Sequence, residues 1–299
     1  MFKVWNNRRD NIMGHVSHSQ FVSYNECNLK WKLRYIDKLG TFTGNIHTLF
    51  GTAMHTTIQT YLTEMYDKSI IAAESLDLNG MLKTEMMKEF TEIKGNQETL
   101  PCSQDDMIEF YQDGMAIIEH FRKHRGKYFM KKNYELVGIE LPITMELQKN
   151  VELKSYLDVV IRNKISGRIT IIDLKTSTRS WTDFHKKNFY KKAQLLLYKQ
   201  FYSEKFNVPL DKITVEFLIL KRKIAKQSDF PISRLQRFEP SNGRPSINKT
   251  MKAFTEFREA IYDEEGNHKT NREYNASPGK ACTFCEFYNT EHCKWGKKL

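Results

Sequence analysis

The hydrophobic period of the chain changes near Tyr134, and this change limits its fold more than any other feature. Before it, apolar residues recur every three or four positions, as in helices packed by one face. After it they alternate in three runs, which are separated by Lys149-Asn150 and by a turn at Ser166-Gly167. The runs are 134–147, 151–163 and 167–177, and a helix at 190–206 and a strand at 212–222 follow. This order predicts an α/β fold, a mixed central sheet flanked by helices, with a helical insertion.

The first half is expected to be mostly helical. We predict helices at 20–36 with Cys27 in the middle, at 47–66, at 78–93 and at 105–124. The polar stretch 267–280 is expected to be a loop. We predict a single domain over 1–299, with the insertion at about 56–133, the core at about 134–263, and a C-terminal segment at about 275–299 packing on the helix around 19–36.

Composition points to a packed protein with a polyanionic partner. The chain has 299 residues, 40% of them hydrophobic, and a net charge of +11. No apolar run has membrane-spanning length and the start has no secretory core, so we expect no membrane association and a cytoplasmic location. The basic residues gather with aromatic neighbours in two places, which favours a nucleic-acid partner over a charge that only aids solubility. These places are Lys186, Lys187, Lys191 and Lys192 beside Trp181, Phe184, Phe189 and Tyr190, and Lys221, Arg222, Lys223 and Lys226.

Two carboxylates and a lysine fall on adjacent predicted strands. Asp158 lies on one strand, and Asp173 and Lys175 alternate past Leu174 onto the same face of the next. Acidic groups placed this way favour a hard cation such as Mg²⁺ or Mn²⁺, and a neighbouring lysine suits phosphate chemistry. Taken alone, Asp-x-Lys is more typical of a surface salt bridge than of a metal site.

Neighbouring polar residues add to this pattern. His55 lies one turn after Gly51 on a predicted helix, and Gln194 and Tyr198 share one face of the helix that follows the Asp-x-Lys strand. Each also fits an ordinary amphipathic helix. Glu140 lies between apolar neighbours and is either a further acidic site residue or an exposed member of an alternating strand.

Cysteines form a second constellation. Cys282, Cys285 and Cys293 lack a fourth ligand that Cys27 can supply, and Cys102 is left over. In a chain without an export signal, disulfides are disfavoured. The spacing fits zinc, with His292 as an alternative ligand, about as well as it fits an iron-sulfur cluster.

The ordered set GTAMH, SYLDVV, IIDLKTS and QLLLY resembles the His, Asp, D-x-K and Q-x-x-x-Y motifs of RecB-like nucleases of the PD-(D/E)xK superfamily. The early cysteine and late C-x-x-C…C resemble the iron-sulfur subset, which includes AddB-type nuclease domains and the CRISPR-associated Cas nuclease. No G-x-x-x-x-G-K-[ST] helicase motif is present. The resemblance spans 19–293.

This resemblance implies a function and a site. It implies a Mg/Mn-dependent DNA exonuclease, and it moves the cysteine interpretation from zinc to a 4Fe-4S cluster. The roles it assigns are metal binding by His55, Asp158, Asp173 and the Leu174 carbonyl; catalysis by Lys175; backbone contact by Gln194 and Tyr198; and cluster ligation by Cys27, Cys282, Cys285 and Cys293.

The loop before the Q-x-x-x-Y helix suggests the substrate form. Its aromatic and basic residues are expected at the mouth of the site, where a ring can stack on unpaired bases. These residues are Trp181, Phe184, Phe189, Lys186 and Lys187. We therefore expect single-stranded DNA ends as the substrate, in repair, recombination or DNA processing. The alternatives are a non-catalytic nucleic-acid-binding subunit on the same fold and a zinc-stapled endonuclease.

Overall fold

The computed structural model describes residues 14–40, 44–224 and 232–294, and these form two compact units. One unit comprises Met1–Thr41, Pro142–Ser155 and Asn248–Leu299, and the other Phe42–Leu141 and Tyr156–Ile247. Lys226 of the second predicted basic group, and the end of the predicted C-terminal segment beyond residue 294, lie outside the described residues.

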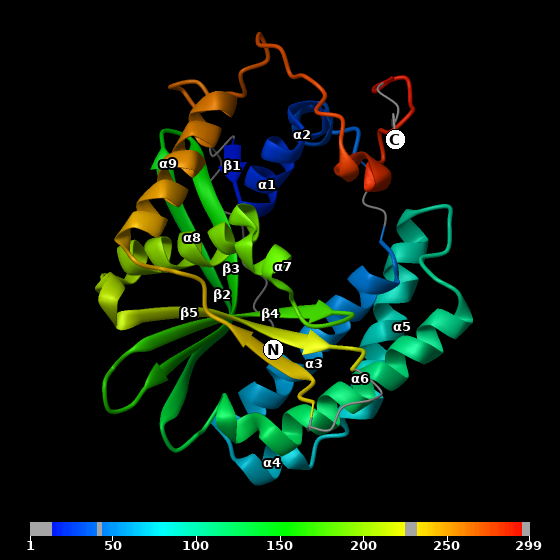
Figure 1. Cartoon of the computed structure of the whole chain (residues 1–299), viewed down its shortest axis with the longest axis vertical. Coiled ribbons are helices and arrows are strands. Elements are labelled where there is room, and N and C mark those ends of the chain that lie inside the picture. The colour runs from blue at the N-terminus through cyan, green and yellow to red at the C-terminus, as the bar shows by residue number, and fades with distance from the viewer. Residues whose placement is uncertain (1–13, 41–43, 225–231, 295–299) are drawn as a thin grey trace. The chain divides into compact units, whose positions relative to one another are not determined.

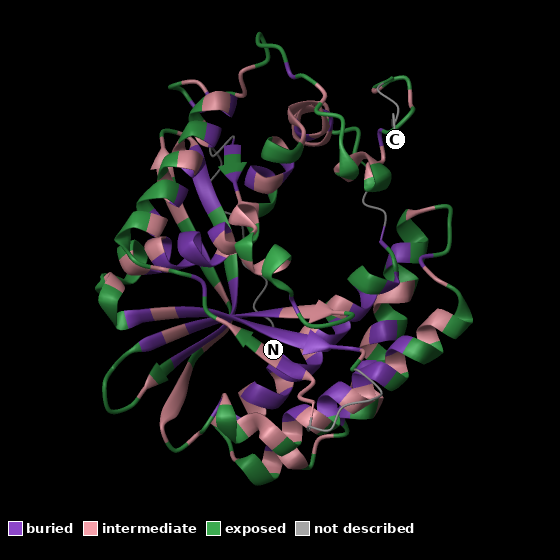
Figure 2. Cartoon of the chain, in the orientation of Figure 1, coloured by how far each residue is buried: buried purple, intermediate pink, exposed green. Residues whose placement is uncertain are grey.

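The second unit is built on strands from the predicted sheet. β2 (Tyr134–Gln148), β3 (Val151–Asn163), β4 (Ile169–Ser177) and β5 (Ile213–Lys221) match the predicted runs, and β6 (Leu235–Phe238) adds a strand the sequence did not suggest. β3 pairs with β2 and β4, β4 runs parallel to β5, and β5 is antiparallel to β6. Parallel and antiparallel pairs occur together, which confirms a mixed sheet within an α/β fold. Figure 2 shows β4 and β5 buried along most of their length.

Helices cover this part of the sheet (Figure 1). The predicted helices are α3 (Ile46–Asp67), α5 (Leu78–Asn96), α6 (Gln104–His124) and α8 (Phe189–Phe206), and the short α4 (Ile70–Glu74) and α7 (Asp183–Lys187) are additional. Asn45 accepts the free amides of His47 and Thr48 at the start of α3. Apolar residues of α3, α5 and α6 form one core with Ile172, Leu174, Leu218 and Leu220 of the sheet. α3 is unbroken from 46 to 67, so residue 56, where the insertion was expected to begin, lies inside a helix.

The first unit joins segments that are distant in sequence. β1 (Gly14–Val16) runs parallel to the start of β3, and α9 (Arg244–Ile261) contributes Phe254 and Phe257 to an aromatic core with Phe21 and Trp31. The predicted helix at 20–36 is wrong in one respect. The chain forms α1 (His18–Glu26) and α2 (Asn28–Tyr35), with Cys27 in an extended conformation between them.

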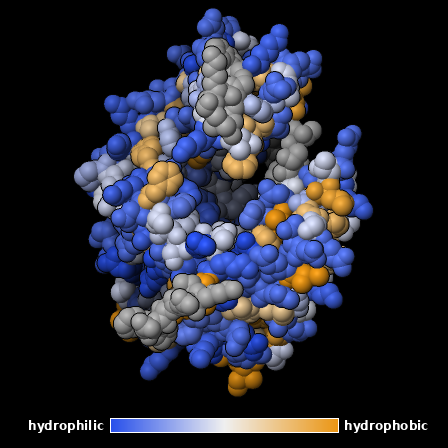
Figure 3. Space-filling view, turned by 45° about the vertical axis from the view of Figure 1, so that its right-hand side comes forward, coloured by the Kyte–Doolittle hydropathy of each residue, from blue (hydrophilic) through white to orange (hydrophobic). Residues whose placement is uncertain are grey.

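No helix in the described part of the chain is long and apolar enough to cross a membrane. The face drawn in Figure 3 is mostly hydrophilic, with apolar residues scattered over it in small groups.

Candidate metal centre

Strands β3 and β4 bring the acidic residues together. Asp173 and Lys175 pair in register with Phe217 and Ile219, while Leu174 points into the apolar core on the other face. Lys175 Nζ lies 2.7 Å from Asp173 Oδ2. The backbone N–H of Leu174 donates to Asp158 Oδ2 at 2.7 Å, which ties the two strands together at the site. The structure thus places the two aspartates and the lysine side by side.

Helix α3 supplies the fourth predicted residue, His55. His55 Nδ1 lies 3.6 Å from Asp158 Oδ2. One turn later, Gln59 donates from Nε2 to the Asp158 backbone carbonyl at 3.3 Å and to the Glu140 carboxylate. Residues four apart share a helix face, so one side of α3 serves both contacts.

Glu140 joins this group. His55, Glu140 and Asp158 each offer a ligand atom within 4.8 Å of the others, a set that could hold a metal ion. The Glu140 backbone has a φ of 46°, in the left-handed region that non-glycine residues rarely adopt. Of the two sequence interpretations of Glu140, its position favours the acidic site residue. Gln59 was not predicted at all, although its spacing from His55 could have indicated it.

Burial opposes charge at this site. It raises the pKa of Asp158 and of Asp173 to about 6, although Lys175 acts in the opposite direction on both. Burial alone would lower the pKa of Lys175, but Asp173 and Asp158 outweigh it, and the pKa is raised. The pKa of His55 is lowered by burial and by Lys175. At neutral pH the site therefore holds a charged lysine and a neutral imidazole. The positive charge of the lysine does not fully offset the cost of burying the two carboxylates.

Asp173 is the most deeply buried of these carboxylates, with 1% of its surface exposed. Within the described part of the chain, neither of its side-chain oxygens accepts a well-formed hydrogen bond, and Oδ2 has its ion pair with Lys175. Buried oxygens of this kind are costly unless a donor or a cation satisfies them.

Helix α8 places the predicted amide and phenol beside the aspartates. Gln194 Nε2 donates to Tyr198 Oη at 2.9 Å. Tyr198 is buried, and burial, followed by the negative charge of Asp173, raises the pKa of its phenol well above the usual value. The phenol therefore stays protonated and able to donate.

The sequence profile of the PD-(D/E)XK nuclease superfamily matches residues 15–290. The chain belongs to this superfamily. The match covers both units and every residue of the centre described above. A search of curated proteins found no match to the chain.

The tryptophan expected to contact nucleic acid is buried, contrary to the sequence prediction. Trp181 is 6% exposed and packs on Phe217, with its backbone N–H bonded to Gln236. Its ring is therefore covered rather than open for stacking. Phe184 on α7, which was also expected at the mouth of the site, is 79% exposed. A loop sequence shows that aromatic rings are present, but tertiary packing decides which of them is buried.

Most residues of the second basic group are buried or paired with acidic side chains. Lys221 and Arg222 are buried, and Arg222 and Lys223 form ion pairs with Glu109 and Asp113 of α6. The surface role suggested by charge alone fails here because two acidic residues from a much earlier part of the chain pair with Arg222 and Lys223. Lys186, which is half-buried, and Lys187, which is exposed, remain on α7 beside Phe184.

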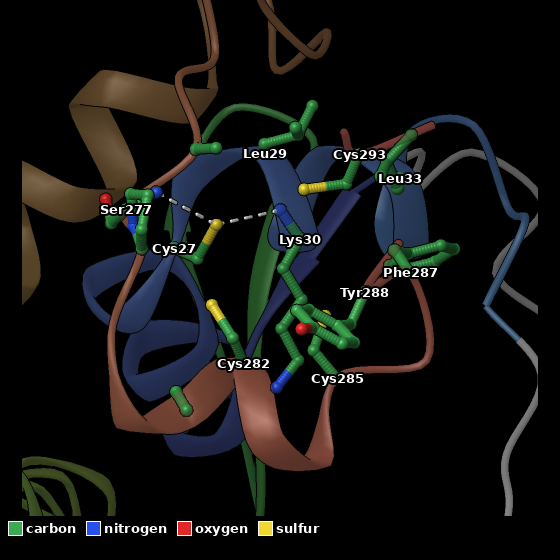
Figure 4. A pocket seen from close by; sticks show the side chains of 13 residues that line it. Cys27, Leu29, Lys30, Leu33, Ser277, Cys282, Cys285, Phe287, Tyr288 and Cys293 are labelled. Atoms are coloured by element: carbon green, nitrogen blue, oxygen red, sulfur yellow. Dashed lines mark hydrogen bonds between the residues drawn. The ribbon is translucent and has the colours of Figure 1, made fainter. Parts of the chain in front are cut away.

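The four predicted cluster cysteines line one pocket in the first unit of the chain (Figure 4). Cys27 Sγ accepts backbone N–H groups from Lys30 and Ser277 at 3.5 Å, and Cys282 Sγ accepts that of Gly279 at 3.4 Å. Cys27 thus caps α2, which explains the break that apolar periodicity concealed. Cys102 lies in the other unit.

Neutralising Asp158 should stabilise the metal-free protein. In EDTA, Asp158→Asn should unfold at higher temperature than the wild type, by roughly 1–3 kcal/mol, because it removes a buried charge with no permanent cation of its own. Saturating Mg²⁺ or Mn²⁺ should raise the melting temperature of the wild type and leave that of the variant nearly unchanged.

Asp113→Asn is the matched control for this experiment. Asp113 is equally buried but is paired with Arg222 and Lys223, so its neutralisation should destabilise the protein with or without a divalent cation. If both variants lose stability in EDTA, the absence of a cation does not destabilise the carboxylates of the candidate centre.

Proposed function

We propose that this chain is a Mg²⁺- or Mn²⁺-dependent deoxyribonuclease of the RecB-like branch, which cuts DNA from single-stranded ends during repair, recombination or DNA processing. One observation carries the proposal: a histidine and two acidic side chains converge within 4.8 Å, beside a buried aspartate and a charged lysine. The superfamily match to residues 15–290 supports a nuclease on independent grounds.

The residues fit a hard divalent cation. Carboxylate oxygens and one imidazole are the usual ligands of such ions, and the unsatisfied oxygens of Asp173 are the kind of group that a cation compensates. His55, Asp158, Asp173 and the Leu174 carbonyl would hold it, and Glu140 joins them. When bound, the ion would stabilise charge on the phosphate and favour hydroxide formation from water.

Other side chains of the site can stabilise the transition state and bind the DNA backbone. Lys175 stays protonated beside Asp173, and a third of its side chain is exposed, so its ammonium can donate to a phosphate oxygen in the transition state. Gln194 orients the Tyr198 phenol through their hydrogen bond, and both are neutral donors suited to the DNA backbone.

A non-catalytic binding subunit on this fold is the main alternative. A scaffold has no physical reason to bury Asp158 and Asp173 side by side, because two acids in a low-dielectric site destabilise the fold unless a cation binds. The buried pair therefore favours a working metal site.

Catalysis should depend on Lys175 and on the metal. Lys175→Ala and Asp173→Ala should each lower the cleavage rate of end-labelled DNA at least about 100-fold, because they remove charge stabilisation at the reacting phosphate. DNA affinity should change little, since basic residues elsewhere supply most of it. Lys212→Ala, on an exposed turn, is the control and should cleave normally.

Cleavage that survives in EDTA, or in both site variants, would contradict the metal-nuclease proposal. A different result would change only the mode of cleavage. If cleavage depends on the metal and on both residues, but closed circular single strands are cut as fast as linear ones, the enzyme is an endonuclease that uses the same centre.

The preference for single strands rests on Phe184. Its ring is exposed on α7, and behind it His185 stacks on Trp181, over which Lys191 lies 4.7 Å from the ring centroid. Packed rings and cations thus fix the base of the loop and leave one aromatic face outside. An exposed ring can stack on an unpaired base but not on one inside a duplex.

Phe184→Ala should weaken single-strand binding by roughly 1–3 kcal/mol, or about 5- to 150-fold, and duplex binding much less. Fluorescence anisotropy with linear single- and double-stranded oligonucleotides measures both. Trp181→Phe is the matched control, because it keeps a ring in the buried position and should leave both affinities near wild type. Equal losses on both substrates for Phe184→Ala would rule out stacking as the basis of the preference.

We further propose a 4Fe-4S cluster on Cys27, Cys282, Cys285 and Cys293. Support comes from their shared pocket and from the backbone N–H groups directed at two of the sulfurs, which favour thiolates. The pocket is otherwise mainly apolar, and Leu29, Leu33 and Phe287 are part of its lining, as suits a large anionic cofactor shielded from water.

The spacing of the sulfurs favours a cluster over zinc. Four thiolates around one zinc ion lie about 3.8 Å apart, given a Zn–S bond of about 2.3 Å in a tetrahedron. Among the described residues, no three of these cysteine sulfurs lie within 4.8 Å of one another. A cluster binds each thiolate at a different iron and so takes a wider set. His292, the alternative zinc ligand, is not among the described residues that line the pocket.

Anaerobically purified protein should contain iron and acid-labile sulfide in equal amounts, near four of each per chain for such a cluster. Cys282→Ser should lose both, because one thiolate fewer leaves an iron unligated. Cys102→Ser is the control and should retain the cluster, since Cys102 lies in the other unit. Stoichiometric zinc from iron-replete cells would decide against the cluster.

A further inference from the structure

Gln59 occupies an unusual place between two acidic residues of the centre. It is 7% exposed, and its Nε2 is the donor to both the Glu140 carboxylate and the Asp158 carbonyl. Both partners are acceptors only, so the amide must present its nitrogen to them and its two hydrogens are both used. A glutamate at this position would offer no donor to either.

Glu140 needs such a restraint. Its side chain is exposed, and a long exposed glutamate loses rotamer entropy when it is held in one position. Its left-handed backbone adds a further cost. A chain retains strain of this kind where the surrounding structure over-determines it, which is typical of functional positions.

Resting on the proposed metal-dependent function, we infer that Gln59 is a positioning residue that fixes Glu140 as a metal ligand. The helix that presents His55 thereby also sets the place of the carboxylate opposite it, since Gln59 follows His55 by one turn of α3. By bonding the Asp158 carbonyl as well, the same amide keeps all three members of the group in one register. Gln59 touches neither the substrate nor the reacting atoms in this role.

A double-mutant cycle with Mn²⁺ alone tests the inference. Gln59→Met keeps the length and packing of the side chain but removes both donors. Binding by the metal-stripped full chain, followed through the electron paramagnetic resonance signal of free Mn²⁺, should weaken about 10- to 100-fold. In a Glu140→Gln background, Gln59→Met should cause no such further loss, because the carboxylate that it positions is gone.

Gln200→Met is the matched control. Gln200 on α8 donates to Glu204 in an exposed pair outside the centre, so the same substitution breaks the same type of bond there. It should leave Mn²⁺ binding unchanged. Melting temperatures in EDTA report whether each variant folds, and Gln59→Leu provides a second variant should Gln59→Met unfold.

The outcomes separate the two proposals. If the wild type binds Mn²⁺ and Gln59→Met binds it equally well, or loses the same factor in both backgrounds, Gln59 is a packing residue and the inference is overturned. If the wild type binds no divalent cation, the proposed metal-dependent function fails together with it.

Discussion

The register of β4 is the constraint on which the candidate centre depends. Ile172 and Leu174 enter the apolar core while Asp173 and Lys175 face the other way, and a nine-residue parallel ladder with β5 holds this alternation. A slip of one residue would put a carboxylate and an ammonium into the core and expose two aliphatic side chains. Burial of the apolar face therefore holds Asp173 and Lys175 in place, although burying these charged groups is itself unfavourable.

On helix α3, too, the packing of apolar residues positions the polar side chains of the centre. Leu49, Phe50, Ala53 and Met54 of this helix are fully or almost fully buried, whereas His55 and Gln59 reach the acidic residues. The ammonium of Lys131 caps the C-terminal end of the helix by donating to three backbone carbonyls, those of Met65, Tyr66 and Lys68. The position of His55 along the helix axis is thus fixed by packing and capping, and the centre is built on rigid elements.

Sequence patterns predicted the elements that have a regular period and one partner surface. Strands β2 to β5 and helices α3, α5, α6 and α8 are of this kind, and the bounds of most agree within a few residues. The break at Cys27 was not predicted because the apolar spacing continues through it. There the Cys27 sulfur, and not a helix carbonyl, accepts the backbone N–H of Lys30.

The site shows the same division between local and tertiary information. His55, Asp158, Asp173 and Lys175 stand in local motifs, so they could be predicted. The spacing of Gln59 from His55 places it on the same helix face, but its partner Glu140 lies 81 positions away, and helical spacing does not reveal that contact. Trp181 was misplaced for the opposite reason, because its burial against Phe217 depends on a strand that follows it in the chain.

The unit that contains the cysteines has the greater need of a cross-link. It is assembled from three separated stretches of chain, so its folding closes long loops, each at a cost in conformational entropy. Non-covalent contacts already join its ends: Arg34 forms a two-point ion pair with Glu286, and Leu29 bonds to the Asn275 carbonyl. These pairs hold Cys27 against the C-terminal cysteines but are individually weak where water reaches them. The cofactor proposed above, bound by thiolates from both ends, would add a cross-link at the place where the loops close.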